Sequence, residues 1–352
     1  MSDATDVVEV SDQARLVAAP LVSVLMITYN HADYLAEAIE GVVSQRCDFS
    51  FELIIGEDAS KDATLEVALA CQRRHPELVR VIHSPANVGM MPNMRRIFAR
   101  ARGEFVAYCE GDDYWCFPDK LARQVELMRG DPSVGIVHAD WVRTHSVDGA
   151  WRLDPRGSSH RRVPLRLLQG DLFRTWHYPK ILRTCTVLLR RETMRELHES
   201  ALARKTYRFG DSVRNAWVTS KWKVAYLPEA AAVYRHSENS ALRSGARSRV
   251  GFYKSCLEFD SDARAFFAGR GDYDAGYRWE SAMALLLWSF RARDGASARL
   301  ALKDLWRHFG PIGFVVTGCR TLFMRRPTLR RQARTLPRDH PAAAPAAKAD
   351  PP

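Results

Sequence analysis

The chain has 352 residues, enough for one large domain with an appended segment or for two modest domains. Hydrophobic residues make up 46% and charged residues 26%, as in ordinary globular proteins, which excludes a membrane-embedded or wholly disordered chain. The net charge of +11 favours an anionic partner. However, seven arginines and no acid lie between positions 320 and 338, and no nucleic-acid-binding module accompanies them, so we expect no nucleic-acid partner.

The two ends of the sequence look unlike its middle. The first residues are acidic and lack the apolar run of a signal peptide, and no stretch reaches the ~18 apolar residues that a spanning helix needs. We expect a disordered leader over 1–18, a main domain over 19–240, a helical and basic extension over 241–338, and a disordered Ala/Pro-rich tail over 339–352. We expect the protein to be cytoplasmic, with at most peripheral contact to the inner face of the membrane.

Strand and helix patterns alternate through the first part of the main domain. Continuous apolar runs predict buried strands, and apolar residues at helical spacing predict the helices between them. The predicted strands cover 21–28, 51–55, 78–83, 104–109 and 134–139, and helices follow near residues 33, 63, 92 and 118. This order indicates an α/β fold with a mostly parallel central sheet flanked by helices.

The second half is less regular. A basic, loop-rich stretch over 141–180 comes first. The remaining patterns predict strands at 184–189, 224–227 and 231–235, and helices at 192–198 and over much of 251–309.

Polar clusters follow three of the predicted strands. In parallel sheets ligands bind beyond the carboxyl ends of the strands, so these clusters should share one edge. They are Thr28, Tyr29 and Asn30; Glu57 and Asp58; and Asp112 and Asp113. The first cluster could flank a nucleobase through its ring and backbone, although Asn30 could equally be a helix N-cap.

Asp112 and Asp113 follow the strand EFVAYC on a tight loop. Two adjacent carboxylates repel one another unless a cation or solvent neutralises them, and carboxylate oxygens suit Mg²⁺ or Mn²⁺. Such an ion can bind the diphosphate of a sugar nucleotide. The plainer alternative is a solvated turn.

Glu57 and Asp58 end the second strand and could accept hydrogen bonds from a base or a ribose hydroxyl. Capping of the following helix is the alternative, although Ser60 and Asp62 are better placed for it. The sequence contains no GxGxxG motif after the first strand and no GxxxxGK[ST] motif, which argues against a dinucleotide-binding or P-loop enzyme.

Three blocks in this order resemble the inverting glycosyltransferases of family 2, which have the GT-A fold. They are VSVLMITYNHADYLAEAI, ELIIGEDASKDAT and NVGMMPNMRRIFARARGEFVAYCEGDDYWCFPDKLARQV. The resemblance runs from about residue 21 to 140 and more weakly to 240. One departure is that Gly56-Glu57-Asp58 stands where the family usually has paired aspartates, and the following Ala59-Ser60 lacks the family's glycine.

The resemblance implies roles for individual residues. Asp58 would bind the nucleobase, Asp113 would hold the metal on the diphosphate, and Asp112 would lie against the nucleotide sugar or the metal. Asn87 and Arg96 fall in the block that resembles the donor-binding segment; a loop cap and a surface cation are their alternative roles.

The later block RFGDSVRNAWVTSKWKVAYLPEAAAVYRHSENS also resembles the family. It places Asp211 where the family has the base that deprotonates the acceptor hydroxyl, with a helix N-cap as the alternative role and Asp140 as a rival base. Arg235 would offset phosphate charge, and His236 would contact the metal or the diphosphate unless it is structural.

The resulting hypothesis is a metal-dependent inverting glycosyltransferase. It would move a sugar from a nucleoside diphosphate sugar, a UDP-sugar by preference, to a glycan or lipid-linked acceptor in surface polysaccharide synthesis. A nucleotidyltransferase and an inactive sugar-nucleotide-binding or membrane-scaffold protein are the alternatives. Apolar residues mixed with arginines over 311–338 predict either peripheral membrane contact or a helix packed on the core.

Overall fold

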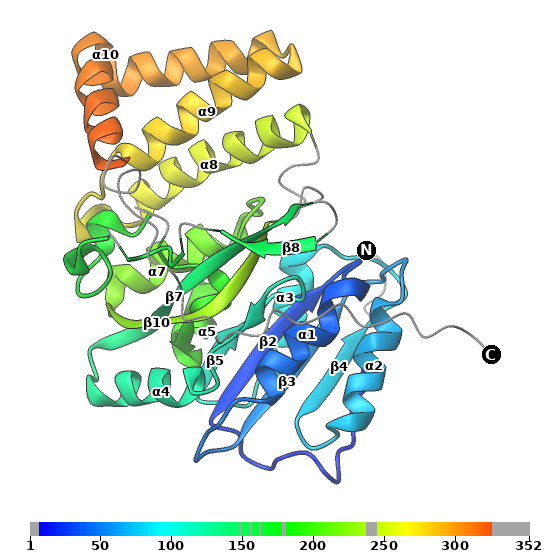
Figure 1. The fold of residues 1–352 in the computed structure, drawn as a ribbon. Coiled ribbons are helices and arrows are strands. Elements are labelled where there is room, and N and C mark those ends of the chain that lie inside the picture. Colours follow the sequence, from blue (N-terminus) through cyan, green and yellow to red (C-terminus); the bar gives the residue numbers. More distant parts are fainter. Residues whose placement is uncertain are drawn as a thin grey trace.

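The computed structural model describes residues 7–147, 150–154, 157–161, 163–177, 181–236 and 245–325 (Figure 1). At 145–147, 150, 204, 236, 318 and 320–325 it describes the backbone alone. The predicted tail over 339–352 and the predicted segment 326–338 therefore lie outside the described residues.

The first half of the main domain is built on four parallel strands. Their order is β4 (Val79–His83), β3 (Phe51–Glu57), β2 (Val22–Thr28) and β5 (Phe105–Tyr108). The helices between them are α1 (Ala32–Val43), α2 (Thr64–Arg74) and α3 (Met90–Phe98). The predicted α/β class is thus confirmed, and the carboxyl ends of β2, β3 and β5 meet at one edge.

The sheet continues past β5 through an antiparallel strand. β9 (Leu188–Arg190) pairs antiparallel with β5 on one side and β7 (Val134–Val147) on the other, and β7 pairs parallel with β10 (Lys223–His236). The short strands β6 (Tyr114–Trp115) and β8 (Ala150–Leu153) pair antiparallel with β10 and β7. The second half also holds α4 (Lys120–Gly130), α5 (Arg191–Glu199), α6 (Ala201–Arg204) and α7 (Asp211–Lys221).

Three elements differ from the sequence-based prediction. The expected disordered leader is wrong for residues 7–18, because β1 (Val8–Val10) pairs antiparallel with β4 at the sheet edge. The strands expected at 224–227 and 231–235 form the single strand β10, interrupted by bulges around Glu229. The strand expected at 184–189 begins as a 3₁₀ turn (Thr184–Thr186) and becomes strand β9 only from Leu188.

The alternation of side chains along the strands builds a core on each face of the sheet. Leu25, Ile54 and Val106 point to one face, whereas Val24 and Ile55 point to the other, and all five are fully buried. Both faces are covered by helices, which explains why the strands read as continuous apolar runs in the sequence.

The C-terminal extension consists of α8 (Ala246–Phe266), α9 (Gly276–Ala292) and α10 (Gly295–Arg325), stacked beyond the sheet (Figure 1). Phe259 of α8 belongs to the core of the main domain, while Leu285 and Leu305 form a separate small core between α9 and α10. α10 bends sharply at Gly310 and Pro311. None of the described helices combines the length and the apolar character needed to cross a bilayer.

Lys120, at the start of α4, is fully buried. Its Nζ lies 3.8 Å from the centre of the Trp115 ring and donates to Gln124 Oε1 at 2.7 Å. Burial lowers the pKa of Lys120 to about 7 from its usual 10.5. Between these values the unfolded chain binds more protons than the folded protein, so stability rises with pH across this window.

We predict that Lys120→Met flattens this dependence. The wild-type free energy of unfolding should rise by up to ~1.4 kcal/mol per pH unit above pH ~7, and the variant should lack that contribution. Urea unfolding at pH ~7 and ~8.5 measures the difference between the two proteins. An equal slope in both would contradict a neutral buried lysine.

Candidate active site

The acidic loop that follows β5 is held against the end of β2. The Gly111 N–H donates to Ile27 O at 3.0 Å, and the Asp113 N–H donates to Glu110 O at 3.0 Å. A Cβ on Gly111 would lie 2.7 Å from Thr28 Oγ1, too close for any side chain. The loop therefore needs glycine at this point in order to lie against Thr28.

The Asp113 carboxylate faces inward. It is almost fully buried and accepts the backbone N–H of Arg235 at 2.9 Å. Burial raises the pKa of Asp113 well above its usual value, and the neighbouring Asp112 and Glu110 raise it further. Asp113 therefore links the acidic loop to β10.

Arg235 strengthens the same link with its side chain. Its Nη1 donates to Asp112 O at 3.0 Å and its Nη2 forms an ion pair with Glu37 of α1. The guanidinium lies over the rings of Tyr114 and Tyr34, 4.6 and 5.3 Å from their centres. Arg235 was predicted to offset phosphate charge. In the structure its guanidinium already interacts with Asp112, Glu37 and two tyrosine rings.

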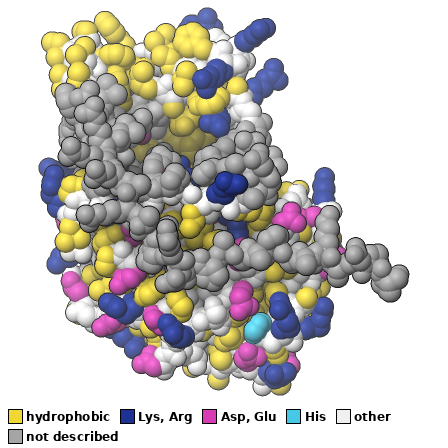
Figure 2. Space-filling model, in the orientation of Figure 1, with side chains coloured by type: hydrophobic (Ala, Val, Ile, Leu, Met, Phe, Trp, Pro, Cys, Tyr) yellow, Lys and Arg dark blue, Asp and Glu magenta, His cyan; other side chains and the backbone are white. Residues whose placement is uncertain are grey.

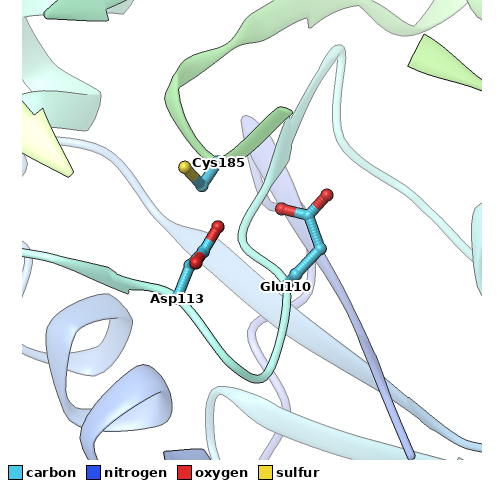
Figure 3. A group of neighbouring side chains, drawn as sticks. All are labelled: Glu110, Asp113 and Cys185. Carbon is cyan, nitrogen blue, oxygen red and sulfur yellow. The ribbon is translucent and has the colours of Figure 1, made fainter. Parts of the chain in front are cut away.

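Glu110 and Asp113, both on the acidic loop, form a compact group with Cys185 (Figure 3). One ligand atom from each lies within 4.8 Å of the others. Burial raises the pKa of Glu110 to about 7, and Asp112 adds to the shift. Burial also raises the pKa of the Cys185 thiol well above its usual value, followed by the effect of Asp113.

Glu110 also has an unused hydrogen-bonding atom. Its Oε2 is buried and has no hydrogen-bond partner within the described part of the chain. An orphaned carboxylate oxygen beside two further acids fits a site that takes up a cation or a polar ligand.

Asp211 is brought to this site by α7, of which it is the first residue. Its Oδ1 accepts the Ser212 N–H at 2.7 Å, while the side chain is exposed. Asp211 also raises the pKa of Glu110, although less than burial and Asp112 do. Two acids from segments about a hundred residues apart in the sequence thus act on the same buried carboxyl.

Arg214 is a residue that the sequence analysis missed. It lies on α7, one turn after Asp211, and is nearly fully buried with its guanidinium over the Tyr108 ring. Its positive charge lowers the pKa of Glu110, and its Nη2 has no hydrogen-bond partner among the described residues. One arginine in a basic helix carries no sequence signal for this position.

Asn30 fastens the loop after β2 to the loop after β3. Asn30 has a positive φ of 54°, its N–H donates to Ser60 Oγ at 2.9 Å, and its Oδ1 accepts from Lys61 N at 2.8 Å. It is therefore not the N-cap of α1; the Ala32 N–H of that helix donates to Asp62 instead.

Two further residues of this edge differ in exposure. Tyr29 is exposed at the edge, whereas Thr28 is buried beneath the acidic loop.

Glu57 and Asp58 are both buried and already hydrogen-bonded. Glu57 accepts the Ser60 N–H at 2.7 Å. Asp58 accepts the N–H groups of Val88 and Gly89 at 2.9 and 2.8 Å. The Asp58 carboxylate therefore shapes the loop that leads into α3.

Asn87 and Arg96 support the same loops. Asn87 donates to Asp58 O at 2.9 Å. Arg96 donates to Glu57 O at 2.8 Å and to Ser84 Oγ at 2.7 Å, so it is not the surface cation that the sequence allowed as an alternative. Burial lowers its pKa.

Two candidates remain. The side chain of His236 lies outside the described residues. Asp140, in β7, is buried and accepts the N–H groups of Trp141 and His160 at 2.7 and 2.9 Å, so its carboxylate is used to hold the segment around His160 against the strand.

We predict that Gly111→Ala destabilises the protein by about 1–3 kcal/mol, the usual cost of forcing a methyl group into a packed site. Gly130→Ala is the matched control, because a Cβ there meets nothing within 4 Å. Chemical denaturation of both variants measures the effect. Equal stability of the two variants would show that the acidic loop is not held against Thr28.

The chain is similar to several known proteins. A 235-residue stretch is 32% identical to an uncharacterised protein of Mycobacterium tuberculosis, covering 66% of this chain and 64% of that relative, so the chain spans less than two thirds of its length. A Bacillus subtilis protein named for teichuronic acid biosynthesis, TuaG, is 34% identical over 109 residues, 31% of this chain and 42% of its own.

A solved structure and a family model agree with these relatives. The mannosyltransferase PcManGT of Pyrobaculum calidifontis, solved with GDP-Man and Mn²⁺, superposes with a TM-score of 0.50 at 18% identity, over 87% of this chain and 88% of that one. This likeness confirms the predicted GT-A fold. Residues 23–197 match the model of the family described as glycosyl transferase family 2. Through these residues, the chain belongs to glycosyl transferase family 2.

Proposed function

We propose that the chain transfers a sugar from a nucleoside diphosphate sugar to an acceptor hydroxyl, with inversion and with the help of Mg²⁺ or Mn²⁺. One observation carries this proposal: the acidic loop brings carboxylate oxygens of Glu110 and Asp113 within 4.8 Å of one another, and the charge of Asp211, the first residue of α7, raises the pKa of the same Glu110. A candidate metal ligand and a candidate base therefore belong to one site, as such a transfer requires. PcManGT, a protein of the same fold, was solved with a sugar nucleotide and Mn²⁺.

For the metal, the geometry favours Asp112 as the residue that binds the ion, with Asp113 holding the acidic loop in place. The Asp112 carboxylate is half-buried and accepts no hydrogen bond from the described residues, whereas Asp113 is buried and bonded to Arg235. Carboxylate oxygens suit Mg²⁺ or Mn²⁺ better than the Cys185 thiol does. The bound ion would supply charge stabilisation for the departing diphosphate. His236 remains a further candidate ligand.

For the donor base, we assign the edge formed by the loops after β2 and β3. A depression of about 620 Å³ lies at the carboxyl ends of β3 and β4, with Glu57, Ser60 and Ser84 in its lining. Tyr29 is exposed at the same edge of the sheet and can flank a base ring. In this proposal Asp58, Asn87, Arg96, Asn30 and Thr28 shape the donor site, and Asp58 reaches the base with its remaining lone pairs.

For the chemical step, Asp211 would take the proton of the acceptor hydroxyl as that oxygen attacks the anomeric carbon. Its position suits this role, because one carboxylate oxygen accepts from Ser212 and the side chain remains exposed to an acceptor. Arg214 and Arg235 would offset negative charge around the diphosphate, Arg214 with its unpaired Nη2 and Arg235 through the loop that it holds.

The substrates are proposed by class. We favour a UDP-sugar as donor and a glycan or lipid-linked acceptor in surface polysaccharide synthesis, in line with the name of TuaG. The corresponding location would be the cytoplasm, with peripheral attachment to the inner face of the membrane.

We predict that Asp112→Asn removes metal-dependent donor binding. A thermal-shift panel of UDP-, GDP-, dTDP- and CMP-sugars, with and without Mn²⁺, identifies the donor for the wild-type protein, since a ligand that binds only the folded state raises its stability. Asp119→Asn, an exposed acid paired with Arg46, is the control. An unchanged Mn²⁺-dependent shift in Asp112→Asn would reject Asp112 as a ligand.

We predict a different defect for Asp211→Asn. The amide cannot accept the proton, so transfer should fall by about 10²–10⁴-fold, the usual contribution of a general base. Donor binding in the thermal-shift assay should be retained. Wild-type rates of sugar transfer in this variant would exclude Asp211 as the base. Loss of donor binding would instead assign Asp211 a role in binding the donor.

A further inference from the structure

The bend of α10 carries an unusual set of exposed apolar side chains. We call this surface the α10 corner and define it by Leu302, Trp306, Ile312, Val315 and Val316. Ile312 is 79% exposed and Trp306 71% exposed, and four of the five most exposed large hydrophobic side chains in the described part of the chain belong to this corner. Figure 2 shows hydrophobic side chains gathered at this end of the molecule, with Lys and Arg side chains beside them.

The bend itself explains why these side chains are not packed. α10 up to Phe309 lies along α9, and Leu305 is buried in the small core between them. Beyond Gly310 the helix turns away from α9. Phe314, in the first turn after the bend, still packs on Trp279, with the two ring centres 4.6 Å apart. The corner therefore projects from the molecule instead of closing over its core.

The charge around the corner is of one sign. Three cations are exposed on the same helix: Lys303 and Arg307 directly follow Leu302 and Trp306, and Arg299 lies three residues before Leu302. The single acid of α10, Asp304, is paired with Arg278 and is not available at the surface. The partner of this corner must therefore accept apolar side chains and cations together.

These properties distinguish between occupants. A second copy of the chain would bring the same cations against one another, which disfavours a symmetric interface. A nucleic acid would match the cations but offers nothing to Ile312, Val315 and Val316. A bilayer rich in anionic lipids matches both, since its headgroups attract cations and its acyl region accepts apolar side chains.

We propose that the α10 corner docks on the surface of an anionic membrane, with Trp306 and Ile312 inserted at the level of the headgroups and the cations of α10 above them. The sequence after α10 is also basic, with arginines at 326, 330, 331, 334 and 338 and no acid before Asp339. The contact surface is thus wider than the segment 311–338, because it begins within the first half of α10. This inference does not rest on the proposed function, since binding to lipid needs no turnover.

Vesicle co-sedimentation of the full chain tests the proposal. We expect the wild-type protein to bind vesicles of equimolar phosphatidylcholine and phosphatidylglycerol, and to bind phosphatidylcholine vesicles at least about tenfold more weakly, because each cation near an anionic surface contributes roughly fivefold. Binding should weaken in high salt. Absent binding to the mixed vesicles, or equal binding to both kinds, would overturn the proposal.

Two pairs of variants assign the binding to the corner. Trp306→Ser with Ile312→Ser should reduce the partition coefficient by at least about tenfold. The matched control is Leu153→Ser with Leu165→Ser, two exposed leucines elsewhere on the molecule. Arg299→Gln with Lys303→Gln should reduce it by about tenfold to thirtyfold, whereas Arg46→Gln with Arg123→Gln, two exposed surface arginines, should not.

The remaining outcomes are equally decisive. Wild-type binding by the Trp306/Ile312 variant would show that the arginines of segment 326–338 alone bind lipid, which contradicts docking by the corner. Light scattering on the vesicle-free protein provides the last check. A dimer that the same variant abolishes would make a second copy the occupant and would also overturn the proposal.

Discussion

The hydrogen bond from the Arg235 backbone to the Asp113 carboxylate joins residues 122 positions apart, and the candidate active site depends on it. A buried carboxylate is costly unless its lone pairs are used. Burial raises the pKa of Asp113, and the hydrogen bond from Arg235 opposes that rise. Through it the acidic loop of the first half of the sheet is fixed to β10 of the second half. The ion pair from Arg235 to Glu37 extends the connection to α1.

The polar residues of this edge divide into two kinds. One kind forms hydrogen bonds to neighbouring loops and so fixes the shape of the edge; these residues are Asp58, Asn87, Arg96 and Asn30. Glu110, by contrast, keeps an atom without a partner among the described residues. Sites of chemistry are expected where such groups persist, because a buried polar atom without a partner costs free energy and is rare in folded proteins.

The sequence predicted the parallel part of the sheet because strands covered on both faces leave continuous apolar runs, as at Val22–Thr28 and Phe51–Glu57. It did not predict β1 or β6, which have three and two residues and owe their conformation to the strand beside them. The acidic loop was recognised from its motif. Which of its carboxylates faces inward depends on contacts with Arg235 and Cys185, distant residues whose proximity no local pattern reveals. Arg214 was missed for the same reason.

The buried thiol of Cys185 can serve as a chemical probe for opening of the acidic loop. Its thiol is fully buried beside Asp113, and its raised pKa keeps it protonated, so a maleimide reagent reaches it only when the acidic loop opens. Cys319 in α10 is exposed and would react at once, giving an internal reference in the same molecule. The delay between the two reactions would then measure the lifetime of the closed loop, and any ligand that holds the loop shut would lengthen it.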